Sequence, residues 1–148
     1  MTTQHILVPV DFSGYAEQAL EYAIALARKL QARLTLLHVI SMMPMGVADG
    51  GVALPYSYIQ ELEAEVQHKM ETYRQRVQEA GLEGTVLVED GTAFQRIVDT
   101  ARDQHVDLIV MGTQGRTGLA HLFLGSVAEK VVRLAPCPVL VTQGSAAQ

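Results

Sequence analysis

The chain has 148 residues, of which 49% are hydrophobic and 18% charged, and its formal net charge is -5. These values fit one globular domain and exclude intrinsic disorder, which needs few apolar residues and a high charge. The acidic balance argues against nucleic acid as the main partner. Because no apolar run approaches the roughly 20 residues of a membrane span and the start lacks a signal peptide's basic cluster, we expect one cytoplasmic domain over 1–148, without membrane insertion.

Short β-type runs alternate with longer helical stripes five times along the chain. The expected strands cover residues 5–10, 33–40, 85–89, 106–111 and 139–142. Strands that alternate with helices are joined by right-handed crossovers, which gives a mostly parallel sheet with helices on both faces. The sequence therefore predicts a doubly wound, five-stranded α/β fold.

Four helices are expected between these strands. Ser13 is the expected N-cap of the first, whose apolar positions recur in steps of three and four. Capping boxes, in which a Ser or Thr is followed three residues later by Gln or Glu, predict the other starts at Ser57–Gln60, Thr92–Gln95 and Ser126–Glu129. The second helix should carry a stripe of apolar residues in steps of three and four, formed by Ile59, Leu62, Val66, Met70, Tyr73 and Val77, and should end at Gly81.

Two features concern the carboxyl end of the predicted sheet. Pro9 cannot donate a ladder hydrogen bond, so we place it where its strand ends, which is also where doubly wound sheets bind ligands. Segment 41–55 holds three glycines, two prolines and three methionines, a composition typical of a loop. Because it leaves its strand at the ligand end of the sheet, we interpret it as a candidate lid.

The cysteine and the histidines give no sign of a metal site. Cys137 is the only cysteine, which excludes an internal disulfide and a cysteine-rich metal site, and we interpret it as a buried structural thiol. His38 and His121 have no metal-ligating partner at a suitable spacing, so packed or solvated histidines are expected.

The segment after the fourth strand carries the chemistry. It reads Gly112-Thr113-Gln114-Gly115-Arg116-Thr117-Gly118, and Gly125-Ser126 follows where the last helix begins. Glycines let a ligand approach the backbone, and a helix start offers unpaired N–H groups and a favourable dipole, so the segment predicts an anion site. Taken singly, the same residues are more typical of a helix cap and ordinary turns than of an anion site.

The chemistry expected of this anion site is binding. It matches neither the phosphate-loop lysine pattern nor a Gly-x-Gly-x-x-Gly motif after the first strand. Arg116 is the only Arg or Lys between Gly112 and Ser126, and no general base is evident. The segment is therefore better suited to holding a triphosphate than to cleaving it, and no catalytic residue is predicted.

The spacing of the glycines resembles the nucleotide-binding pattern of the universal stress protein family. Two residues separate Gly112 from Gly115, and nine separate Gly115 from Gly125. The resemblance covers the whole chain, including Ile6-Leu7-Val8-Pro9-Val10-Asp11, His38-Val39 and Ala135-Pro136-Cys137-Pro138-Val139. It implies a Rossmann-like sheet ordered 3-2-1-4-5, ATP binding, and a homodimer in which the fifth strands meet at Val139 and Val141.

The resemblance also implies a position for each residue around ATP. Pro9, Val10 and Asp11 would line the adenosine, with Asp11 accepting from the ribose hydroxyls unless it merely caps the first helix. Val39 would meet adenine through its backbone. Ribose and phosphates would contact Met111, Gly112, Thr113, Gln114, Gly115, Arg116, Thr117 and Gly118, and the phosphates would also contact Gly125, Ser126 and Val127. A Mg²⁺ or Mn²⁺ ion, if bound, would be held mainly by phosphate oxygens and water.

Three functional hypotheses follow. In the first, ATP occupancy changes the shape or the partners of a dimeric stress-response protein that is not an enzyme. In the second, the chain is a slow ATP hydrolase or phosphotransfer enzyme, which is weaker because Asp11 is the only nearby carboxylate and its expected partner is ribose. In the third, the chain is a dimeric interaction module whose pocket is vestigial or holds another adenine nucleotide, such as cAMP.

Overall fold

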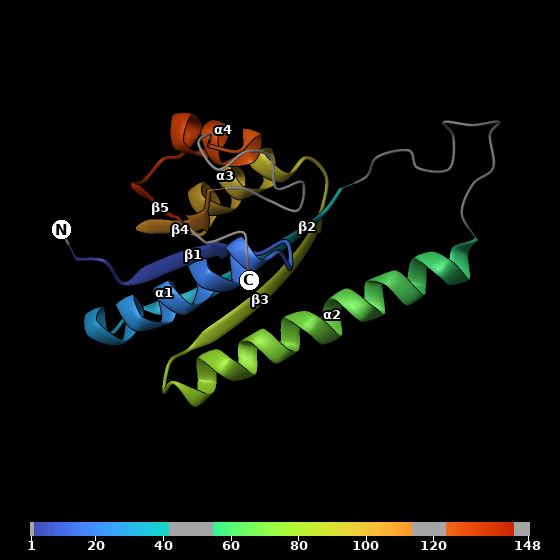
Figure 1. The fold of residues 1–148 in the computed structure, drawn as a ribbon, viewed down its shortest axis with the longest axis horizontal. Helices are drawn as coiled ribbons and strands as arrows, with labels where there is room; N and C mark the ends of the chain where they lie inside the picture. Colours follow the sequence, from blue (N-terminus) through green and yellow to red (C-terminus); the bar gives the residue numbers. More distant parts are fainter. Residues whose placement is uncertain (1, 42–54, 114–123, 144–148) are drawn as a thin grey trace.

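The computed structural model describes residues 2–41, 55–113 and 124–143, which form one sheet with helices on both faces (Figure 1). The strands pair in parallel in the order β3-β2-β1-β4-β5, which confirms the predicted fold class and order. The elements are β1 (His5–Pro9), α1 (Gly14–Leu30), β2 (Arg33–Ile40), α2 (Tyr56–Glu79), β3 (Gly84–Asp90), α3 (Ala93–Asp103), β4 (Leu108–Gly112), α4 (Ser126–Leu134) and β5 (Val139–Thr142).

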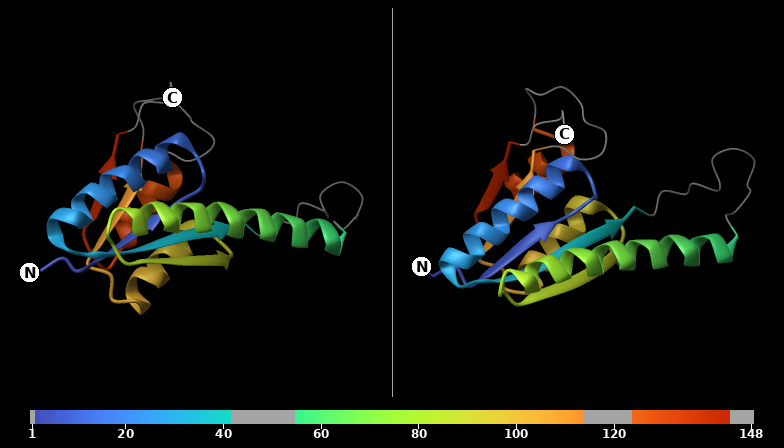
Figure 2. Two further views of the ribbon diagram at one scale, coloured as in Figure 1. Left: turned by 90° about the horizontal axis from the view of Figure 1, so that it is seen from below. Right: turned by 60° about the horizontal axis from the view of Figure 1, so that its bottom comes forward.

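Two hydrophobic cores lie on opposite sides of the sheet. Helices α1 and α2 pack on one face and α3 and α4 on the other (Figures 1 and 2). Successive residues of a strand point to opposite faces, so Ile6 and Val8 of β1 enter the first core and Leu7 enters the second. Strand β1 is therefore buried on both faces, which explains its uninterrupted apolar run. None of the described helices is both long and apolar enough to cross a membrane.

The first and third helices begin where predicted, but only one has the expected side-chain cap. Ser13 is the N-cap of α1, and its hydroxyl accepts a hydrogen bond from the Ala16 N–H at 3.2 Å. Thr92 is the N-cap of α3 but makes no side-chain capping bond. The Gln95 amide, its predicted capping-box partner, instead lies 3.5 Å from the Asp99 carboxylate, so this capping box is wrong.

Helix α2 departs most from the prediction. It begins at Tyr56, and its N-cap is Pro55, whose carbonyl accepts from the N–H groups of Tyr58 and Ile59. The predicted Ser57–Gln60 capping box is therefore wrong, because the fixed φ of Pro55 already sets the backbone at the residue before the helix.

The apolar stripe of α2 is buried only along its carboxyl-terminal part. Met70 and Val77 are fully buried, whereas Ile59 and Leu62 are 39% and 40% exposed. The reason is length, because 24 helical residues span about 36 Å and the eight residues of β2 about 26 Å. The amino-terminal end of α2 extends past the sheet (Figures 1 and 2).

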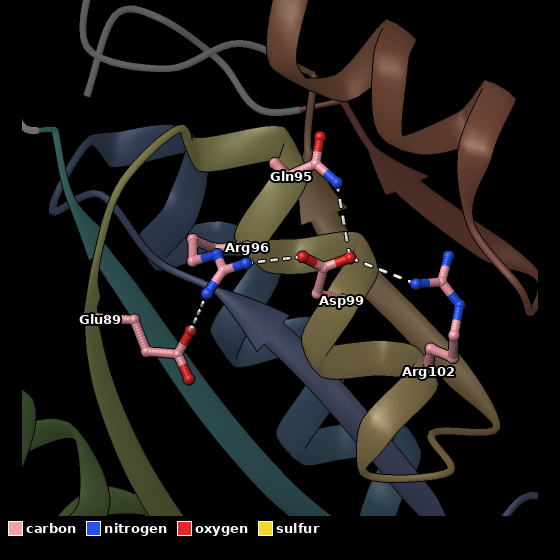
Figure 3. Close-up of polar contacts among 5 residues, drawn as sticks. All are labelled: Glu89, Gln95, Arg96, Asp99 and Arg102. Carbon is pink, nitrogen blue, oxygen red and sulfur yellow. Dashed lines mark hydrogen bonds and ion pairs between the residues drawn. The ribbon is translucent and has the colours of Figure 1, made fainter.

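A polar cluster links α3 to β3 (Figure 3). The Arg96 guanidinium lies 2.6 Å from Asp99 and 3.9 Å from Glu89 of β3, and Arg102 lies 3.2 Å from Asp99. The Arg96 stem also packs under Gly91 in the β3–α3 turn, where an added Cβ would meet it at 3.5 Å. These groups are partly exposed, so they orient the start of α3 more than they stabilise the fold.

His5 is buried at the opposite, amino edge of the sheet. Its Nε2 lies 2.7 Å from the Thr35 hydroxyl, and its Nδ1 lies 3.2 Å from the Gln104 carbonyl and 3.3 Å from the Arg33 guanidinium. Burial, and secondly the positive charge of Arg33, lower the pKa of His5 below its ordinary value. The folded protein therefore resists protonation at this site more than the unfolded chain does.

This difference in pKa predicts a pH-dependent stability. As the pH falls through about 6.5, the unfolded chain takes up a proton that folded His5 resists, so the free energy of unfolding should decrease. We expect His5→Gln to remove this part of the decrease, measured from urea midpoints at about pH 7.5 and about pH 5.5. His68→Gln, at an exposed position of α2, is the control. An unchanged pH dependence in His5→Gln would contradict the assignment.

Candidate functional site

The strand order creates a switch point between β1 and β4. The chain leaves β1 towards β2 on one side of the sheet and leaves β4 towards β5 on the other, so the two connections diverge there. Doubly wound sheets bind ligands at this place, outside the carboxyl ends of the strands. Residues 9–11 begin with the last residue of β1, and residues 111–113 contain the last two residues of β4, so the structure places these two predicted segments at the same edge.

Pro9 separates β1 from β4 at this edge. The Val10 N–H donates to the Leu37 carbonyl at 2.8 Å, so Val10 faces β2 and the preceding Pro9 faces β4. Pro9 has no N–H to donate to β4, and the paired residues of β1 and β4 stop at Leu7↔Ile109. The predicted position of Pro9 at the strand end is confirmed, and its missing donor explains why the ladder ends early.

The start of α4 is held against the end of β4. The Gly125 N–H donates to the Thr113 carbonyl at 2.6 Å, and the Thr113 N–H donates to the Thr142 carbonyl of β5 at 3.1 Å. These two hydrogen bonds fix the first turn of α4, with Ser126 and Val127, beside the carboxyl ends of β4 and β5. The two ends of the predicted anion-binding segment, Gly112–Thr113 and Gly125–Val127, are thus brought together.

The predicted Ser126–Glu129 capping box is wrong. Gly125 is the N-cap, Ser126 is the first helical residue, and none of the described side chains caps the helix. The Glu129 carboxylate pairs with Arg133 one turn further on, and its N–H donates to the Gly125 carbonyl at 2.9 Å. The backbone N–H groups of the first turn come before this hydrogen bond, so they have no acceptor within the helix. They can therefore donate to a bound anion.

The backbone of Val39 faces the same edge. Because Leu37 bonds to Val10, Val39, two residues on, also directs its N–H and C=O towards β1. The next acceptor there is the Val10 carbonyl, which accepts instead from Nδ1 of His38 at 2.7 Å. Among the residues that the structure describes, no backbone hydrogen bond joins Val39 to β1. The Val39 N–H is thus available as a donor, and the Val39 C=O as an acceptor, for hydrogen bonds to a planar heterocycle.

Sequence reasoning missed Phe12 and His38 at this edge. Phe12 has φ = 67°, a left-handed conformation that is uncommon for a bulky residue. Its ring stacks on the His38 ring, with the two centroids 4.4 Å apart, and the centroid of the Tyr73 ring of α2 lies 5.9 Å from that of Phe12. This packing holds the turn in which Asp11 accepts from the Ser13 N–H at 3.0 Å. Asp11 therefore orders the turn before α1, while Ser13 is the actual cap.

Gly112 has a packing role that its sequence context did not reveal. A Cβ at this position would lie 2.9 Å from both the Cβ and the carbonyl oxygen of Tyr15 in the first turns of α1. Real Cβ atoms do not approach backbone this closely, so only glycine lets β4 end against α1. The absence of a side chain at Gly112 serves this close contact.

Several predicted groups need separate comment. Gln114, Gly115, Arg116, Thr117 and Gly118 lie outside the described residues, as do His121 and most of the candidate lid at 41–55. His38 is packed as expected, and the described residues contain no group of three His, Cys, Asp or Glu side chains that could hold a metal ion. Cys137 is free and only half-buried, and burial raises the pKa of its thiol, which makes it a weak nucleophile.

Gly112→Ala should destabilise the protein by about 1–3 kcal/mol, the usual range for overpacking, because β4 must move away from α1. Urea unfolding measures the effect. A second change, Tyr15→Ala, should not rescue the variant, because the contacted Cβ and carbonyl remain in alanine. Wild-type stability in Gly112→Ala would contradict the close packing.

Phe12→Gly should be more stable than Phe12→Ala by about 1 kcal/mol, because both lose the ring contacts but only glycine adopts a positive φ without strain. The same pair of substitutions at Phe94, inside helix α3, is the control, and there alanine should be the more stable. Thermal or urea unfolding of the four variants gives the two differences. Equal stability of the Phe12 variants would show that the turn is not strained.

Comparisons with known proteins agree with this architecture. The family model described as the universal stress protein family matches residues 2–143. Universal stress protein YxiE of Bacillus subtilis is 33% identical, with 93% of this chain and 97% of YxiE covered. The solved structure of MJ0577, from Methanocaldococcus jannaschii, superposes with a TM-score of 0.85 at 32% identity, covering 98% of this chain and 99% of that one.

A third relative was solved with a ligand. The structure of the universal stress protein from Archaeoglobus fulgidus in complex with dAMP has a TM-score of 0.65 at 26% identity, covering 95% of this chain and 98% of that one. The family model covers nearly all of this chain, and the curated relatives match it at about the same length. This chain therefore belongs to the universal stress protein family.

Proposed function

We propose that this chain binds ATP at the carboxyl edge between β1 and β4, and that occupancy changes the shape or the partners of a dimer in the cytoplasm. The observation that carries the proposal is the start of α4, which has no side-chain cap and is held at the switch point. Such a helix start favours phosphate. The ligand of the Archaeoglobus fulgidus relative, dAMP, is an adenine nucleotide, which supports the same class of ligand here.

The described residues fit the three parts of ATP. Adenine would pair with the backbone N–H and C=O of Val39, beside Pro9 and Val10. Ribose would donate to Asp11, whose carboxylate has acceptor capacity beyond the Ser13 hydrogen bond. The phosphates would accept hydrogen bonds from the N–H groups of the first turn of α4 and from the Ser126 hydroxyl. Residues 114–118 would add the contacts predicted from the sequence.

A divalent ion, if ATP carries one, would be held by phosphate oxygens and water. The proposed partner of Asp11 is the ribose and not the phosphates, which makes this carboxylate a weak candidate for the general base of hydrolysis. We therefore propose that the chain holds the nucleotide and is not an enzyme.

We place the dimer contact at β5, through Val139 and Val141. Strand β5 lies at one edge of the sheet, with β4 as its neighbour on one side, and its residues are half-buried in the single chain. An open edge is a template for pairing with a strand of a second chain.

The proposal predicts which substitutions abolish ATP binding. Gly125 has φ = -62°, which any residue adopts, so Gly125→Val leaves the backbone undisturbed while placing a side chain at the phosphates. Combined with Gly115→Val, it should weaken ATP binding at least tenfold, measured by titration calorimetry. Asp11→Asn should weaken binding by about tenfold, the usual loss for one hydrogen bond to a charged group.

Controls separate binding from folding. Asp103→Asn changes an exposed carboxylate at the end of α3 and should bind ATP like the wild type, and circular dichroism should be unchanged in all variants. Mass spectrometry of nucleotide released from the purified protein identifies the natural ligand. Unchanged affinity in the folded double glycine variant would refute the site, and metal-dependent turnover lost in Asp11→Asn would establish the hydrolase instead.

A further inference from the structure

None of the residues that the structure describes covers the amino-terminal end of α2. All ten residues from Tyr56 to Glu65 are exposed, and this part of α2 lies beyond the sheet (Figures 1 and 2). Ten residues of helix extend for about 15 Å. Most helices in proteins are stabilised by tertiary packing of one face, and none of the described residues supplies it here.

This end of α2 nevertheless carries an apolar face. Ile59, Leu62 and Val66 recur in steps of three and four and continue the buried row of Met70 and Val77 along the same side of the helix. Tyr58, 46% exposed, adjoins Leu62 one turn away. Val66 already packs against the first core, so we name Tyr58, Ile59 and Leu62 the α2 extension face. The same side of α2 packs in the core at Met70 and Val77, so the α2 extension face has the apolar composition of a packed helix face.

The charges around the α2 extension face have one sign. Glu61, Glu63 and Glu65 lie within this end of the helix, and no Lys or Arg occurs between Pro55 and His68. At 100° per residue, Glu63 and Glu65 fall on opposite sides of the apolar row. Glu65 has an ion-pair partner in Lys69 at 3.3 Å, whereas Glu61 and Glu63 form no ion pair with any described residue.

We propose that the α2 extension face docks a basic amphipathic helix of another protein. The partner would lay an apolar row on Ile59 and Leu62, and its Lys and Arg side chains would meet the glutamates on both sides. A second copy of this chain fits poorly, because it would bring the same glutamates and a net charge of -5. One such helix against ten residues makes a small interface, as in transient signalling contacts.

The test uses the full chain and a synthetic helix. The probe is a fluorescein-labelled peptide with a leucine row flanked on both sides by lysines, and the comparison peptide has glutamate at every lysine position. Fluorescence anisotropy should show binding of the basic peptide and at least tenfold weaker binding of the acidic one. Ile59→Ser with Leu62→Ser should weaken binding of the basic peptide at least tenfold, and so should Glu63→Gln with Glu65→Gln.

Matched controls make the result specific to this face. Val132→Ser with Leu134→Ser removes two apolar side chains of similar exposure from α4, and Glu79→Gln with Asp103→Asn removes two exposed carboxylates elsewhere. Both pairs should bind the basic peptide like the wild type. Equal binding of the two peptides, or losses as large in the controls, would overturn the proposal. So would conversion of a dimer to a monomer by Ile59→Ser with Leu62→Ser in sedimentation, which would make the face a self-contact.

Discussion

The early end of the hydrogen-bond ladder between β1 and β4 is the constraint on which the site depends. Strand β1 is the centre of the sheet and is buried on both faces, so its register fixes β2 on one side and β4 on the other. Pro9 faces β4 without a donor, and the two strands separate beyond Leu7↔Ile109. The switch point opens where the proline interrupts pairing, and the starts of α1 and α4 converge on it.

The strands could be predicted well because each is a short apolar run between turn residues. The bounds of β2 and β5 match the structure, and β1, β3 and β4 differ from prediction only near their ends. Helix starts were less predictable. The Ser-x-x-Gln and Ser-x-x-Glu patterns at Ser57 and Ser126 lie just inside helices whose N-caps are Pro55 and Gly125. Such a pattern therefore predicts that a helix starts nearby, but not which residue is its N-cap.

The candidate site could be located from the sequence, but its supporting contacts could not. The spacing of glycines after β4 and the position of Pro9 were enough to identify the carboxyl edge. The positive φ of Phe12 and the bond from His38 to the Val10 carbonyl depend on how the ends of β1, β2 and α2 meet in three dimensions. Gly112 shows the same limit. Position 112 requires glycine because it lies close against Tyr15, a residue almost a hundred positions away in the chain.

Helix α2 joins the turn at Phe12 to a distant surface. Tyr73 and Lys69 both contact the Phe12 ring, with Lys69 Nζ 5.0 Å from its centroid, so α2 rests on the turn that carries Asp11. From Tyr73 to Tyr56 the helix runs for about 25 Å. The turn that carries Asp11 and the exposed start of α2 are therefore joined by one continuous helix. Any tilt of α2 on this turn would move Tyr56 further than Tyr73.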